Sequence, residues 1–104
     1  MNKMILEALQ NGETVTIRPR GNSMRPRIVS KAKVTLAPFD PENPPQKGDV
    51  VLCRVKGNTY CHLVAATRGQ GETLEWQISN NKGRVNGWTR TIYGVVTDVD
   101  NSAA

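Results

Sequence analysis

Two short segments carry residue types that could do hydrolytic chemistry. In Gly21-Asn22-Ser23-Met24-Arg25-Pro26, a glycine and a proline enclose a serine on a constrained turn. The segment Tyr60-Cys61-His62-Leu63-Val64 holds the only histidine of the chain. A serine hydroxyl is a weak nucleophile until a neighbouring base takes its proton, and an imidazole can do so near neutral pH. The sequence therefore predicts that Ser23 and His62 meet in space.

The residues around the serine have expected roles in this hypothesis. The backbone N–H of Ser23 and the side chain of Asn22 would hold an oxyanion formed from a peptide carbonyl. Met24 is expected to pack beneath the turn, and Pro26 to stiffen it. The alternative is a turn serine that satisfies local backbone groups, together with a half-buried strand histidine.

Length and composition bound the class of protein. The 104 residues correspond to one domain, expected to span residues 1–104. Hydrophobic residues make up 38% and aromatic residues 5%, so the core must consist mainly of Val, Ile, Leu and Ala. No apolar run approaches the length of about 18 residues that a membrane span needs. The first residues lack a signal-peptide pattern, so we expect a cytoplasmic protein without a membrane partner.

A net charge of +5 favours acidic partners. Many of the bases gather near the serine: Arg18, Arg20, Arg25, Arg27, Lys31 and Lys33. One interpretation is a solvated basic face or a rim around a peptide groove. The other is a nucleic-acid contact, which is less favoured because these residues alternate along the chain and so point to both sides of the sheet edge.

The two cysteines, Cys53 and Cys61, are too few for a disulfide framework. Neither a C-x-x-C spacing nor a second histidine accompanies them, so we expect buried thiols, no metal and no cofactor.

Residue periodicity predicts a short helix followed by strands. Residues 3–10 carry an apolar stripe of Met4, Ile5, Ala8 and Leu9, with Asn2 as the N-cap and Gly12 past the end. Alternation and β-branched runs predict strands over residues 13–18, 33–37, 50–55, 59–66, 74–78 and 91–99.

Glycine, proline and asparagine mark the connections. Residues 40–45 form a proline-rich surface loop, and Gly48 and Asp49 a structural turn in which Asp49 caps backbone donors. A hairpin turn is expected at Gly57-Asn58, a loop over residues 80–87, a bulge at Gly94 and a frayed tail over 101–104. The prediction is a mostly β domain, a small coiled sheet or partly open barrel with one short N-terminal helix.

Four landmarks occur in a recognisable order. They are Ser23-Met24-Arg25-Pro26, then Gly48-Asp49 before a β-branched strand, then His62-Leu63-Val64, then Ser79-Asn80-Asn81 with Asn86 close behind. Over about residues 13–99, this order resembles the catalytic core shared by type I signal peptidases and self-cleaving LexA-like repressors. The resemblance implies the coiled β fold of that core, a peptide substrate, and small side chains before the cut.

Three positions depart from the patterns of the family. His62 stands where bacterial signal peptidases and LexA-like proteins carry a lysine, which resembles the Ser–His form of archaeal and eukaryotic-type signal peptidases. Asn86 stands where that form has an aspartate, and Ser79 replaces the loop's usual aspartate. An asparagine can orient an imidazole but cannot stabilise an imidazolium as a carboxylate does. Asn86 is therefore either the group that orients His62 or half of an Asn-Gly turn, and Asp98 or Asp100 is the alternative acid.

Two classes of function follow. The first is a soluble serine peptidase with a Ser23–His62 dyad, oriented by Asn86, that cleaves an extended peptide added as a strand beside the nucleophile loop. The second is an inactive peptidase-fold module that binds a peptide, an acidic protein or nucleic acid. By analogy, a core that lacks both a membrane anchor and a DNA-binding domain suggests a phage or mobile-element protein. The sequence leaves the oligomeric state open.

Overall fold

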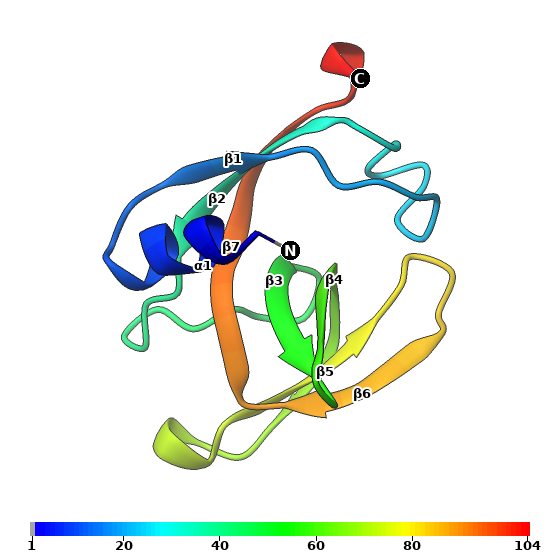
Figure 1. Ribbon diagram of the computed structural model, residues 1–104. Helices are drawn as coiled ribbons and strands as arrows, with labels where there is room; N and C mark the ends of the chain where they lie inside the picture. The colour runs from blue at the N-terminus through cyan, green and yellow to red at the C-terminus, as the bar shows by residue number, and fades with distance from the viewer. Residues whose placement is uncertain (1) are drawn as a thin grey trace.

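The computed structural model describes residues 2–104. The seven strands found in this part of the chain form one antiparallel sheet (Figure 1). The elements are α1 (Lys3–Gln10), β1 (Val15–Ile17), β2 (Lys33–Pro38), β3 (Val50–Val55), β4 (Asn58–Arg68), η1 (Gly71–Thr73), β5 (Glu75–Ser79), β6 (Val85–Thr89), β7 (Thr91–Asp100) and η2 (Asn101–Ala103). The strand order is β1-β2-β7-β3-β4-β5-β6. The predicted mostly β fold with one short N-terminal helix is confirmed, and the sheet is open.

Strand β3 lies at the centre of the sheet and is buried on both faces. Its run of β-branched residues alternates between two hydrophobic clusters. Val50 and Leu52 pack with α1, β1 and β2, whereas Val51, Cys53 and Val55 pack with Trp76 and Ile78. A strand that is covered on both faces has a nearly continuous apolar sequence, so the bounds of β3 were predicted correctly.

Helix α1 covers one face of the sheet near β7. The side chain of Asn2 accepts a hydrogen bond from the amide of Met4, as expected of an N-cap. Leu9 is buried, but Met4, which was predicted to belong to the apolar stripe, is 73% exposed. Leu6 packs against the core in addition to Ile5, so the buried face is rotated by part of a turn.

The hairpin turn between β3 and β4 lies one residue earlier than predicted. Lys56 and Gly57 both have positive φ angles, of 50° and 84°, and Asn58 already pairs with Val55. Two left-handed residues in succession are typical of the tight turn that matches strand twist. The predicted bulge at Gly94 is confirmed, because the pairing with β3 shifts register between Leu52 and Cys53, opposite Gly94 and Ile92.

Two other predictions are wrong. Residues 85–87, which were predicted to belong to the loop over 80–87, are part of strand β6 (Val85–Thr89), and Gly87 pairs with Ile78. The C-terminal residues are not frayed, because they form η2, which the side chain of Asp100 caps by accepting from the amide of Ser102.

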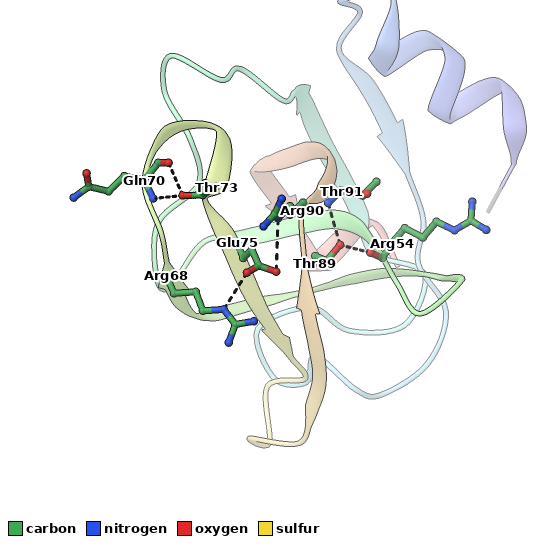
Figure 2. Close-up of polar contacts among 8 residues, drawn as sticks. All are labelled: Arg54, Arg68, Gln70, Thr73, Glu75, Thr89, Arg90 and Thr91. Atoms are coloured by element: carbon green, nitrogen blue, oxygen red, sulfur yellow. Dashed lines mark hydrogen bonds and ion pairs between the residues drawn. The ribbon is translucent and has the colours of Figure 1, made fainter.

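The sheet coils so that β6 returns toward β3. The hydroxyl of Thr89 donates to the carbonyl of Arg54, a contact drawn in Figure 2. A side chain at Gly87 would meet Val55 at 3.1 Å, so β6 approaches β3 closely at a residue without a Cβ. In the described residues, no helix has the length and apolar character needed to cross a membrane.

Candidate active site

Ser23 and His62, which are 39 positions apart in the sequence, form a hydrogen-bonded pair. The Oγ of Ser23 lies 3.0 Å from the Nε2 of His62. The predicted proximity of these two side chains is therefore confirmed. This distance is within the range in which a base can take a proton from a nucleophile.

Asn86 completes a chain of three side chains. Its Oδ1 lies 2.7 Å from the Nδ1 of His62. A carbonyl oxygen can only accept, so Nδ1 must carry a hydrogen and donate it. In the neutral ring, Nε2 then has a free lone pair and accepts from the Ser23 hydroxyl. The arrangement leaves His62 in the tautomer that a general base requires, and Asn86 does not form the predicted alternative, an Asn-Gly turn.

Strand β4 fixes the position of the imidazole. His62 pairs with Val51 of the central strand and is 9% exposed. The ring of Tyr60 stacks against it, with 5.0 Å between ring centroids and 26° between planes. The imidazole is thus held by the strand, by an aromatic neighbour and by Asn86, and its free nitrogen faces the serine.

The loop between β1 and β2 presents Ser23. Met24 is 4% exposed and anchors the loop in the core, as predicted, whereas Asn22 and Pro26 are exposed. Gly21 has a φ of 110°, a conformation that side chains disfavour, and its amide donates to the hydroxyl of Ser30. Glycine is therefore required where the chain turns toward the nucleophile.

A loop between β5 and β6 holds the nucleophile from the other side. The amide of Asn81 donates to the carbonyl of Ser23 at 2.9 Å, and its side chain donates to the carbonyl of Arg25 at 3.1 Å. Asn80 shapes this loop, because its Oδ1 accepts from the amides of Lys82 and Arg84. The sequence marked this segment only as a landmark, and the role of Asn81 was missed.

The C-terminal residues also hold the nucleophile loop. The side chain of Asn101 accepts from the amide of Val29 and donates to the carbonyl of Arg27. The guanidinium of Arg18 donates to the carbonyl of Ala103. The tail residues that were expected to fray are therefore supports of this loop, and short-range sequence patterns carry no signal of such contacts.

Several predicted residues lie away from the catalytic pair. The Oδ2 of Asp49 accepts from the amide of Gln46, and the neighbouring Gly48 has a positive φ angle. These two observations confirm the structural turn. Ser79 is buried and donates to the carbonyl of Asn80. Asp100 accepts two hydrogen bonds from Ser102 rather than one from His62, and the side-chain bond is the main cause that lowers its pKa.

The two thiols lie on β3 and β4. Cys53 pairs with Tyr60 and Cys61 with Leu52, so the two sulfurs point to opposite faces of the sheet. Burial raises the pKa of each thiol to about 12, so neither is a nucleophile at neutral pH. Within residues 2–104, no group of three potential metal-binding His, Cys, Asp or Glu side chains occurs.

A pocket of about 250 Å³ opens beside the pair. Its lining residues come from the nucleophile loop and the start of β4: Pro19, Arg20, Gly21, Ser23, Met24, Ile28, Val29, Thr59, Tyr60, Cys61 and His62. Apolar side chains form much of its wall, and its size suits one side chain of a ligand rather than a folded partner.

The chain was compared with protein-family models, curated proteins and solved structures, and none matched.

Proposed function

We propose that this protein is a serine peptidase that cleaves an extended peptide, with Ser23 as the nucleophile and His62 as the general base. The observation that supports this most is the unbroken chain from the Ser23 hydroxyl through both ring nitrogens of His62 to Asn86. Turn serines and strand histidines without a catalytic role have no reason to align in this order. The alignment is the one that transfers a proton from serine to a base held in the correct tautomer.

The proposed reaction is acyl transfer. The Oγ of Ser23 forms a bond to the carbonyl carbon of the substrate while its proton passes to the Nε2 of His62. His62 then gives this proton to the leaving amine as the peptide bond breaks, and water hydrolyses the acyl-enzyme. The amide of Ser23 is the proposed oxyanion donor, because none of the hydrogen bonds found among residues 2–104 uses it. Asn22, exposed beside it, is the second proposed donor.

The substrate would enter as an added strand. Pairing between β4 and β5 begins at Leu63, so residues 59–62 of β4 pair only with β3 in the part of the chain that the structure describes. This free edge borders both the pocket and His62. A peptide paired along it would place one side chain in the pocket and the next carbonyl near Ser23.

A fluorophosphonate probe tests the proposal without knowledge of the substrate. The Oγ of Ser23 would form a bond to phosphorus and displace fluoride, which adds a defined mass to the intact protein. Labelling of the native chain that disappears in both Ser23→Ala and His62→Ala is expected. Absence of labelling in the folded native protein, or labelling that survives Ser23→Ala, would refute the peptidase proposal.

The second candidate is a binding module with the same groove and no turnover. The neutral Asn86 favours it, because a carboxylate would stabilise the imidazolium better. A cytoplasmic location stays a prediction for either candidate. Two unpaired thiols fit a reducing compartment.

A further inference from the structure

The three segments that border the candidate site contain no acidic residue. Residues 14–39, 50–71 and 76–97 lack aspartate and glutamate entirely, although the chain has 9 of them. The nucleophile loop, the free edge of β4 and the β5–β6 loop all belong to these segments. A ligand in the groove is therefore surrounded by backbone, neutral side chains and bases.

Four exposed arginine and lysine residues line the pocket, follow Ser23 closely in the sequence or lie in the loop between β5 and β6. We define them as the basic rim: Arg20, Arg25, Lys82 and Arg84. Arg20 lines the pocket, and Arg25 follows Ser23 by two residues. The two hydrogen bonds from Asn81 bring the loop that carries Lys82 against the nucleophile loop. Figure 1 shows these two loops, in blue to cyan and in yellow, on the same side of the molecule.

The basic rim carries charge that the protein itself does not neutralise. None of its four members forms an ion pair with a carboxylate within residues 2–104. The two arginines that contact Glu75 in Figure 2 are different. Arg68 and Arg90 contact the two carboxylate oxygens of Glu75 at 3.1 and 3.8 Å. The four charges of the basic rim are therefore available to a ligand in the groove.

We propose that the basic rim selects acidic peptides, with aspartate or glutamate on the residues that flank the side chain held in the pocket. This inference rests on the proposed peptide groove. The free edge of β4 offers backbone groups to an extended peptide, and the rim places guanidinium and ammonium groups beside it.

A peptide fits these features better than a nucleic acid does. The pocket admits one side chain and is lined by apolar residues such as Met24 and Ile28. Single-stranded nucleic acids need aromatic faces on which bases stack, but the ring of Tyr60 already stacks on His62.

Binding is measured with the Ser23→Ala protein, so that turnover cannot destroy the ligand. The probes are two fluorescein-labelled peptide pools with four randomised central positions, flanked in one pool by Asp and Glu and in the other by Asn and Gln. A labelled 20-nucleotide single strand is the third probe. We expect the acidic pool to bind about tenfold tighter at low salt, and this preference to shrink at about 200 mM salt because exposed charges are screened.

Reversal of two charges of the basic rim tests whether the rim causes the preference for the acidic pool. Lys82→Glu combined with Arg84→Glu should abolish the preference. The matched control, Lys3→Glu with Lys47→Glu, makes the same change in net charge on α1 and on the loop before β3 and should retain it. Equal binding of the two pools would overturn the inference. It would also be overturned by an equal loss in the control, or by tighter binding of the nucleic acid that depends on Lys82 and Arg84.

The outcome is independent of the peptidase test. A native protein that does not react with the fluorophosphonate but prefers the acidic pool would refute turnover and support the rim. A protein that is labelled at Ser23 but shows no preference would support turnover and refute the rim.

Discussion

Replacement of Asn86 by aspartate should increase the reactivity of Ser23 by about tenfold. The Oδ1 of Asn86 already accepts from the Nδ1 of His62 at 2.7 Å, so the ring is in the productive tautomer. Aspartate would keep this hydrogen bond and add a charge that stabilises the imidazolium formed as serine loses its proton.

The structure limits the size of the effect. Exchange of aspartate for asparagine in a serine protease triad costs about 10⁴ in rate, because the amide then favours the wrong tautomer. That penalty does not apply where the amide oxygen faces Nδ1. The remaining gain is the difference between a neutral hydrogen bond, about 0.5–1.5 kcal/mol, and a charged one, about 1.5–3 kcal/mol. A difference of about 1–1.5 kcal/mol corresponds to about tenfold in rate.

The assay is the second-order rate of fluorophosphonate labelling, followed by intact mass at several pH values. Asn86→Ala should be slower than the native protein, and Asn43→Asp provides an equal charge change on an exposed loop residue and should leave the rate unchanged. An unchanged or lower rate in Asn86→Asp would show that Asn86 does not orient the base. A gain of a thousandfold or more would show that the native amide presents its nitrogen to His62.

Three further predictions follow from particular contacts. Asn81→Ala removes the side-chain hydrogen bond to the nucleophile loop and should slow labelling several-fold, with a stability loss of only about 0.5–1.5 kcal/mol in urea unfolding. The thiols of Cys53 and Cys61, whose pKa values are raised to about 12, should react slowly with iodoacetamide at pH 8.5 until the protein is denatured; fast alkylation of Cys53 in the native protein would contradict its burial. Gly94→Ala would place a Cβ 2.8 Å from the carbonyl of Ala37 and should destabilise the fold by about 1–3 kcal/mol, read as a lower midpoint of thermal unfolding; an unchanged midpoint would contradict this close approach.

The sequence predicted best those elements that local patterns determine. Strand β3 was predicted with correct bounds because its apolar run is buried on both faces. Helix α1 was predicted because Asn2 and Gly12 mark its two ends. The pairing of Ser23 with His62 could be predicted because Ser23 lies on a constrained turn and His62 is the only histidine of the chain.

The missed elements depend on contacts between distant residues. Strand β6 contains Asn86-Gly87, which alone is typical of a turn, but Gly87 pairs with Ile78 and packs against Val55. Asn101 holds the amide of Val29 across 72 positions of sequence. Neither contact leaves a pattern in its own neighbourhood, so tertiary packing overrode the local preference.

The β5–β6 hairpin explains how a small domain can set the geometry of three side chains. Asn81 at its tip holds the carbonyl of Ser23, and Asn86 on its second strand holds the ring of His62. Asn80 accepts from the amides of Lys82 and Arg84 in the loop between them, so the two contacts belong to one hydrogen-bonded hairpin. The same hairpin therefore holds both the base and the nucleophile in position. A change in this hairpin would therefore disturb the supports of the nucleophile and of the base at the same time.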